Sequence, residues 1–218
     1  MTEISRDSLG DAIYRRVCQD LVRGKLRPNQ KITIRSLAET LGTSSTPVRD
    51  AVQRLLRDNA LEQRTVRDVR VPMLSVEQYL EVSYIRAELE SLAAAHTASL
   101  ATQKDIARLE RLVSRNVEAI DSERWALANE LNQQFHFALA EISGMPMLVD
   151  VLGRLWLRMG PLLADYYSTG VRDMTKHHHE IVTACLNRDC DAARAAMRLD
   201  IETAREGIVG YINTLKPT

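Results

Sequence analysis

The stretch IRSLAETLGTSSTPVRDAVQRLL, from Ile34 to Leu56, predicts two short helices joined by a tight turn. Gly42 suits the left-handed position that ends the first helix. The hydroxyl residues after it can cap a second helix, and Pro47 fits the first turn, where a missing N–H costs little. Apolar residues of the second segment recur three and four positions apart, as on one buried helical face: Val48, Ala51, Val52, Leu55 and Leu56.

Two short helices at a tight turn, the second opening with hydroxyl residues and the outward-facing Arg49, are typical of a helix-turn-helix. The start of a helix suits phosphate oxygens, and arginine can bond guanine bidentately in the major groove. The motif therefore predicts a DNA-binding helix pair. The alternative is an ordinary helical hairpin in an all-α protein.

The flanking sequence extends this motif on both sides. Its pattern predicts one amphipathic helix and three short strands, at residues 8–23, 31–34, 62–66 and 69–71. The last two strands would form a hairpin with a charged tip at Arg67 and Asp68, which completes a winged helix-turn-helix. Arg64, Arg67 and Arg70 of this hairpin would meet phosphate or the minor groove, unless the hairpin is merely a solvated basic surface.

Composition is that of a globular protein, with 218 residues, 45% hydrophobic and 27% charged. No run approaches the about 20 apolar residues of a membrane span, and the polar start is unlike a signal peptide. Three scattered cysteines do not suggest a disulfide framework. We expect a cytoplasmic protein, nucleoid-associated when bound to DNA, with no membrane partner.

The charge is distributed unevenly between the two parts of the chain. Residues 1–74 hold 14 Lys and Arg against 9 Asp and Glu, a net of +5, whereas residues 75–218 hold 15 against 20, a net of −5. A basic portion joined to an acidic one suits a DNA-binding module with a second module of another role. The sequence therefore predicts a winged helix-turn-helix domain at 1–74 and a separate domain at 75–218.

The second domain has a helical pattern throughout. About six helices are expected: near residues 75–100, 102–120 and 121–143, a fourth that begins near Met147, and two more near 172–187 and 189–215. Gly160 and Pro161 should kink or split the fourth. This pattern predicts an antiparallel all-helical bundle, and the fold class of the whole chain is mainly α.

Histidines in this bundle suggest a polar site. Asn132 and His136 lie four residues apart and share one helical face. If the apolar residues after it are buried, His178 points inward, whereas His177 and His179 face solvent. Imidazoles and carboxylate or amide oxygens that converge in a bundle core usually hold a divalent metal. A histidine beside aromatic residues is, however, more often an ordinary core residue.

Residues 8–74 resemble the GntR family of bacterial transcriptional regulators. The similarity lies in GKLRP from Gly24 and in LAETLGTSSTPVRDAVQRL from Leu37, with its TPVRDA core. It implies DNA contacts from five residues: Arg35, Ser44, Ser45, Thr46 and Arg49. Two positions depart from the family pattern. Ser45 replaces an arginine common in the family, and Asp68 replaces the usual wing-tip glycine and would put an anion near phosphate.

Residues 76–218 resemble the ligand-binding FCD domain of the FadR-type branch of this family. The matching segments are RAELE from Arg86, Phe135-His136 with Leu139, His178 with Ile181 and Ala184, and DAARAAMR from Asp191. Members of that domain often hold a metal through one Asp and three His. The corresponding set here is Asn132, His136, His178 and Asp200. An amide oxygen is a weaker ligand than a carboxylate, and this donor set suits Zn²⁺, Ni²⁺ or Mn²⁺.

Two interpretations of these four residues stay open: a metal site, or a metal-free polar pocket whose ligand bonds them directly. The resemblance also implies a small organic acid as effector, with Arg86 holding its carboxylate bidentately. The alternative partner for Arg86 is a protein carboxylate, Glu90 or Glu141.

The combined prediction is a ligand-responsive transcriptional regulator, with repression the expected mode. The family resemblance implies a homodimer, which would bind a pseudo-palindromic double-stranded operator. The alternative is a metalloenzyme that uses His136 and His178 and carries an accessory DNA-binding head. The chain has no His-Glu-x-x-His, nucleophile elbow or phosphate loop, so we expect no enzyme.

Overall fold

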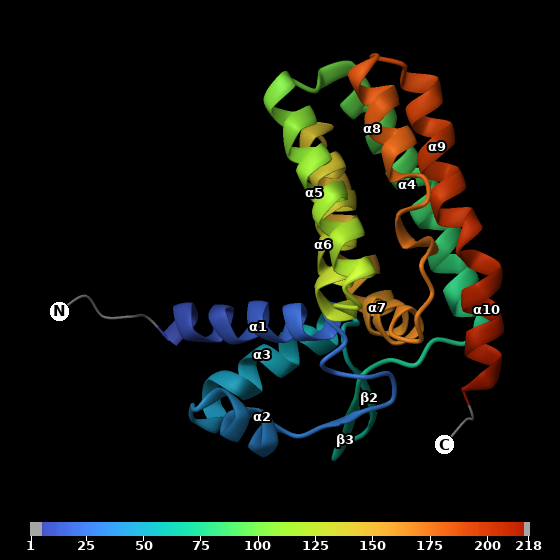
Figure 1. Ribbon diagram of the computed structural model, residues 1–218. Helices are drawn as coiled ribbons and strands as arrows, with labels where there is room; N and C mark the ends of the chain where they lie inside the picture. Colours follow the sequence, from blue (N-terminus) through green and yellow to red (C-terminus); the bar gives the residue numbers. More distant parts are fainter. Residues whose placement is uncertain (1–5, 216–218) are drawn as a thin grey trace. The chain divides into compact units, whose positions relative to one another are not determined.

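A computed structural model describes residues 6–215, with side chains from Leu9 onward, and divides the chain into two compact units. The first consists of the chain up to Met73 together with Trp156–Asp165, and the second of Leu74–Leu155 together with the chain from Tyr166. Most described residues lie in helices (Figure 1), which confirms the mainly α fold class.

The first unit is a winged helix-turn-helix. Its main elements are α1 (Arg6–Val22), β1 (Lys31–Ile32), α2 (Ile34–Leu41), α3 (Ser45–Arg57), β2 (Glu62–Thr65) and β3 (Asp68–Arg70). The three short strands form an antiparallel sheet in the order β1-β3-β2. The hairpin turns at Val66 and Arg67, one residue earlier than the predicted tip, because Asp68 already pairs with Thr65 as part of β3.

Local sequence accounts for the helix pair. The Thr33 hydroxyl caps α2 by accepting a hydrogen bond from the Ser36 N–H, and Gly42 ends this helix with φ of 63°. The α3 side chains Val48, Ala51, Val52 and Leu55 are buried, as the periodicity predicted. They join a core with α1 residues that include Ile13, Val17 and Leu21. This shared core fixes α3 with its polar face outward.

The second unit is a helical bundle. Its elements are α4 (Val76–Leu100), α5 (Gln103–Asp121), α6 (Trp125–Ile142), the two ends of α7 (Pro146–Tyr167), the 3-10 turn η1 (Asp173–Thr175), α8 (His178–Leu186), α9 (Cys190–Thr203) and α10 (Arg205–Thr214). Capping boxes at Ser75 and Thr102 start α4 and α5. Helix α4 packs against α9 and α6, and α8 packs against α9. Among residues 6–215, no helix is both long and apolar enough to cross a bilayer.

Three helix predictions need correction. Of the predicted kink or split in α7, the split does not occur, because the helix runs through Pro161. The buried Met159, Leu162 and Leu163 stabilise it against the loss of one backbone hydrogen bond. The predicted last helix is divided at Ala204 into α9 and α10. The predicted helix at 172–187 is shortened to α8, with η1 before it.

Candidate DNA-binding surface and metal centre

The start of α3 presents a polar surface. Ser44 occupies the N-cap position, but its side chain makes no capping hydrogen bond, so its hydroxyl is available to a ligand. Ser45 and Thr46 follow in the first turn, and Arg49 lies one turn later; all are exposed. The first N–H groups of a helix have no intrahelical acceptor, so this end of α3 suits an anion such as a phosphate.

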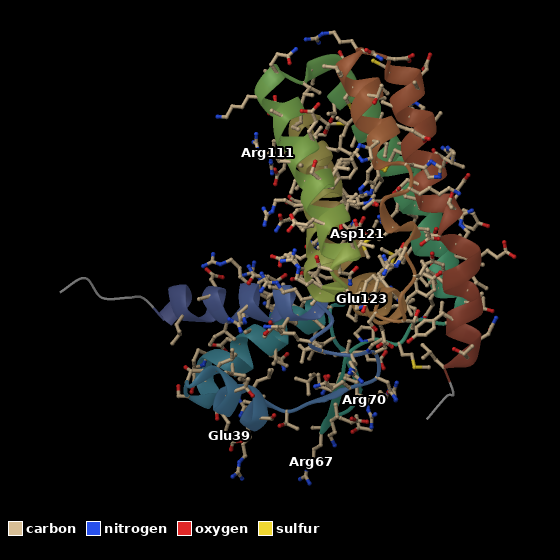
Figure 2. All side chains as sticks on the ribbon, in the orientation of Figure 1. Glu39, Arg67, Arg70, Arg111, Asp121 and Glu123 are labelled. Carbon is tan, nitrogen blue, oxygen red and sulfur yellow. The ribbon has the colours of Figure 1, made fainter. Side chains whose placement is uncertain are left out.

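Arg35 lies on α2, and its side chain is 90% exposed. Its Nε donates to Glu39 Oε1 at 2.9 Å, four residues later on the same helix. Exposed pairs of this kind contribute at most about 1 kcal/mol, so a phosphate can displace the carboxylate. Figure 2 shows Glu39 and Arg67 projecting from the same edge of the first unit in this view.

The three wing arginines differ in their surroundings. Arg64 Nε donates to Glu62 at 2.8 Å, and Arg70 Nε donates to the Asp68 carboxylate at 3.0 Å. Within the described chain, the Arg67 guanidinium at the tip has no ion-pair partner. Asp68 is not an isolated anion at the wing tip, because Arg70 pairs with its carboxylate and the turn lies before it.

Asp68 and Arg70 also stabilise the base of the wing. Arg70 Nη1 donates to the backbone oxygen of Asn29 at 3.1 Å and lies 3.3 Å from its side-chain oxygen. The Arg70 and Asp68 side chains are both mostly buried. Arg70 therefore joins the hairpin to the loop before β1 and is not a free cation.

In the second unit, three helices bring together His136 of α6, His178 of α8 and Asp200 of α9. One ligand atom of each lies within 4.8 Å of the others. Both His136 Nε2 and His178 Nε2 lie 3.6 Å from an oxygen of Asp200. Two nitrogens and a carboxylate facing one point form a usual ligand set for a divalent transition metal.

The packing of α6 and α8 explains this convergence. Leu131, Phe135 and Leu139 on α6 are fully buried, which turns the same side of the helix, with His136, toward the interior. The Phe135 ring stacks on the His178 ring, with centroids 4.0 Å apart and planes at 23°. This contact fixes the orientation of the His178 imidazole.

Asn132 lies one turn before His136 and is also buried. Its Oδ1 has no hydrogen-bond partner among the described residues, and neither ring nitrogen of His178 has one. Buried polar atoms without partners are rare and costly. A divalent metal, which needs lone-pair donors of this kind, would supply the missing partner, so these residues fit a metal.

Electrostatics also fit metal binding. Burial lowers the pKa of His178 well below its usual range, which keeps the imidazole neutral, the form that binds a metal. Burial raises the pKa of Asp200 to about 6, although His136 and Arg86 oppose that effect. A cation bound between these residues would stabilise the Asp200 carboxylate.

Glu90 was not among the site residues predicted from the sequence. Glu90 Oε2 lies 2.6 Å from His136 Nδ1, the ring nitrogen on the far side from Asp200. Arg86 Nε donates to Glu90 Oε1 at 2.5 Å. Burial opposes ionisation of Glu90, but Arg86 and His136 outweigh it and lower its pKa to about 2. The signal in the sequence was the i,i+4 spacing of Arg86 and Glu90 on a buried helical face.

This arrangement changes the expected role of Arg86, whose side chain is 7% exposed. Its partner is the protein carboxylate Glu90, the alternative considered from the sequence. The prediction for His177 is wrong: it is buried, with Nδ1 2.8 Å from Glu180 and Nε2 3.2 Å from Thr203. His179 is exposed, as predicted.

The winged helix-turn-helix has an exposed helix start that bears hydroxyl groups and an arginine, and the chain also contains a separate helical bundle. Together these features define a class of DNA-binding transcriptional regulators. Family models agree: the model for bacterial regulatory proteins of the gntR family matches residues 9–71, and the FCD domain model matches residues 81–203. The chain belongs to the gntR family, in the branch with a C-terminal FCD domain.

Characterised relatives are regulators as well. The HTH-type transcriptional regulator McbR of Escherichia coli K12 is 32% identical over 175 residues, which cover 78% of this chain and 79% of McbR. The transcriptional repressor RspR of the same strain is 25% identical over 199 residues, covering 90% and 87%. Both names describe transcriptional regulators.

A solved structure of E. coli McbR/YncC superposes with a TM-score of 0.87 at 28% identity, covering 94% of this chain and 98% of that one. A regulator from Rhodococcus sp. RHA1, with a TM-score of 0.79 at 21% identity, shares the fold.

Proposed function

We propose that this protein is an operator-binding transcriptional regulator that responds to a small organic acid through a divalent metal in its helical bundle. Residues 1–74 would form the DNA-binding domain, and residues 75–218 the effector-binding and dimerisation domain. The sensing part of this proposal rests on the convergence of His136, His178 and Asp200. It also rests on buried atoms without a hydrogen-bond partner among the described residues, namely Asn132 Oδ1 and both ring nitrogens of His178.

Five residues of the helix pair would contact DNA: Arg35, Ser44, Ser45, Thr46 and Arg49. The exposed start of α3 supports this assignment, since its hydroxyls and N–H groups suit phosphate while Arg49 can reach a base edge. A homodimer would present two such surfaces to a pseudo-palindromic operator. Repression is the mode we propose, by analogy with the relative named as a repressor. A regulator of this kind acts at the chromosome in the cytoplasm.

The residues that would hold the metal are Asn132, His136, His178 and Asp200. Two imidazoles, one carboxylate and one amide oxygen suit Zn²⁺ or Ni²⁺, with Mn²⁺ a harder alternative. A bound metal would supply a Lewis acid for an effector carboxylate. The same residues could instead bond an effector directly in a metal-free pocket. An effector carboxylate at Arg86 would share the guanidinium with Glu90 or compete with it.

Two measurements test the sensing proposal. Metal analysis of protein purified without a histidine tag should find one divalent ion per chain, lost in His136→Ala. A thermal-shift screen of mono- and dicarboxylates, with and without metal, should find acids that raise stability by a few kcal/mol when well above their Kd, about 2.7 kcal/mol at about 100 times Kd. If an acid stabilised only the metal-free protein, the metal-free pocket that bonds the effector directly would be favoured. Turnover of the acid would favour an enzyme.

Operator binding has its own test. Binding to a duplex from the native locus should weaken steeply as salt rises, because bound phosphates release counterions. A protein that fails to bind this duplex even at low salt would not be the regulator proposed.

A further inference from the structure

We infer that Glu90 is a positioning residue that fixes the His136 ring, with the Nε2 lone pair directed at Asp200. This inference rests on the proposed metal function. It adds to the four proposed ligands a carboxylate from a fourth helix, α4, which would not itself touch the metal.

The geometry places Glu90 and Asp200 on opposite edges of one imidazole. Glu90 Oε2 lies 2.6 Å from His136 Nδ1, an ion-pair contact without the alignment of a hydrogen bond. An Asp200 oxygen lies 3.6 Å from His136 Nε2. A neutral imidazole has one N–H, and a carboxylate oxygen can only accept. We therefore expect the proton on Nδ1, because the nearby carboxylate favours an N–H at that edge of the ring, and the lone pair on Nε2.

Arg86 holds Glu90 in this position. Its Nε donates to Oε1 at 2.5 Å, which leaves Oε2 for His136. The side chains of Arg86 and Glu90 are 7% and 2% exposed, so water does not compete for the carboxylate. A buried, doubly held carboxylate cannot rotate freely, and the chain from Arg86 through Glu90 to His136 therefore restrains the ring.

Such outer carboxylates have a general effect on metal sites. They fix the histidine tautomer, orient the ring and raise the basicity of the ligating nitrogen. Their loss typically costs about 10–100-fold in metal affinity. We expect a loss of this size for Glu90, although it belongs to none of the elements that carry the proposed ligands.

The first arm of the test measures Zn²⁺ affinity of the full-length protein by calorimetry. Glu90→Gln, which keeps the size and removes the charge, should weaken the Kd by about 10–100-fold. Glu88→Gln is the matched control, because Glu88 lies on the same helix, is exposed and pairs with Arg198. Glu90→Asp, which keeps a carboxylate, should recover part of the loss. A folded Glu90→Gln protein with the wild-type Kd would overturn the inference.

The second arm needs no metal and no variant at position 90. Nitrogen NMR of the metal-free wild type at about pH 8, well above the ordinary histidine pKa, reports which ring nitrogen carries the proton. The His136 resonances are assigned by comparison with His136→Asn. A proton on Nδ1 supports the inference, and a proton on Nε2 overturns it. If the wild type binds no metal, the proposed metal function fails, while this arm still tests the role of Glu90.

Discussion

His136 Nε2 and His178 Nε2 each lie 3.6 Å from a different oxygen of Asp200, so that one carboxylate faces two imidazoles in the interior of the bundle. The two histidine rings are close to perpendicular, at 79°, with centroids 5.4 Å apart. Nitrogens that point toward one carboxylate from two directions leave a space between them for a shared cation.

Removing one of these imidazoles should abolish stabilisation by metal. For the wild type, Zn²⁺ at about 100 times its Kd should add about 2.7 kcal/mol to the free energy of unfolding. His178→Ala should lose this gain, because it removes a buried donor. Denaturant unfolding with and without Zn²⁺ measures the difference. His179→Ala, an exposed neighbour, should keep the gain; equal gains in both variants would contradict the assigned site.

Changing Asn132 to Asp should strengthen metal binding. The amide oxygen is the weakest donor of the proposed set, and a carboxylate adds a negative charge beside the cation. We expect Asn132→Asp to lower the Zn²⁺ Kd by about tenfold, which corresponds to about 1.4 kcal/mol. Calorimetric titration checks this. Asn129→Asp, also buried on α6 one turn earlier, is the matched control. An unchanged Kd for Asn132→Asp would remove Asn132 from the ligand set.

The helix-turn-helix could be predicted from the sequence because its signals are local. Gly42 adopts the left-handed conformation, with φ of 63°, and the buried face of α3 follows the spacing of its apolar residues. The wing was placed one residue off, since the register of a short hairpin depends on pairing rather than on composition. The sequence left open whether Pro161 would kink or split its helix, and tertiary packing outweighed the local preference for a split.

The site was predictable only in part. The family pattern selected His136, His178 and Asp200, which the fold brings together. Glu90 was missed as a partner of His136 because the two residues are 46 positions apart, and no local pattern reports that contact. His177 was placed in solvent by periodicity, yet it precedes α8 as its N-cap residue, where helical phasing no longer applies.

Cys185 should react with alkylating reagents only when the protein opens. Burial raises the pKa of this thiol to about 12, so at about pH 8 it stays protonated and is unreactive. Because its pKa is raised in the folded state, the thiol contributes to the free energy of unfolding, and this contribution is complete below its unfolded-state pKa of about 8.5. The contribution falls as the pH rises from about 8.5 toward the folded-state pKa. Mass spectrometry of iodoacetamide-treated protein measures the labelling.

The partly exposed Cys190, five residues later, is the internal control. Its labelling should precede that of Cys185 in native buffer, and both should label together in denaturant. Equal native rates for the two thiols would show that α8 opens locally rather than with the whole unit.

Arg49 should contribute to sequence specificity. If it bonds a base edge bidentately, Arg49→Ala should cost about 1–3 kcal/mol on the operator and much less on unrelated duplex. Arg57→Ala is the control, because Arg57 is exposed at the opposite end of α3. Fluorescence anisotropy with both duplexes gives the two affinities. A uniform loss on both would assign Arg49 to phosphate rather than to a base.

Two of the wing arginines, Arg67 and Arg70, should behave differently. Arg67 has no ion pair within the described chain, whereas Arg70 is held by Asp68 and Asn29. Arg67→Ala should leave the free energy of unfolding unchanged and reduce the slope of log affinity against log salt by about one, the loss of one phosphate contact. Arg70→Ala should mainly destabilise the first unit, by about 1–3 kcal/mol, since it leaves a partly buried carboxylate without its partner. Denaturant unfolding and salt titrations of operator binding separate the two effects. If Arg70→Ala changed the salt slope while the free energy of unfolding stayed the same, Arg70 would be a DNA contact. Its ion pair with Asp68 would then not stabilise the wing.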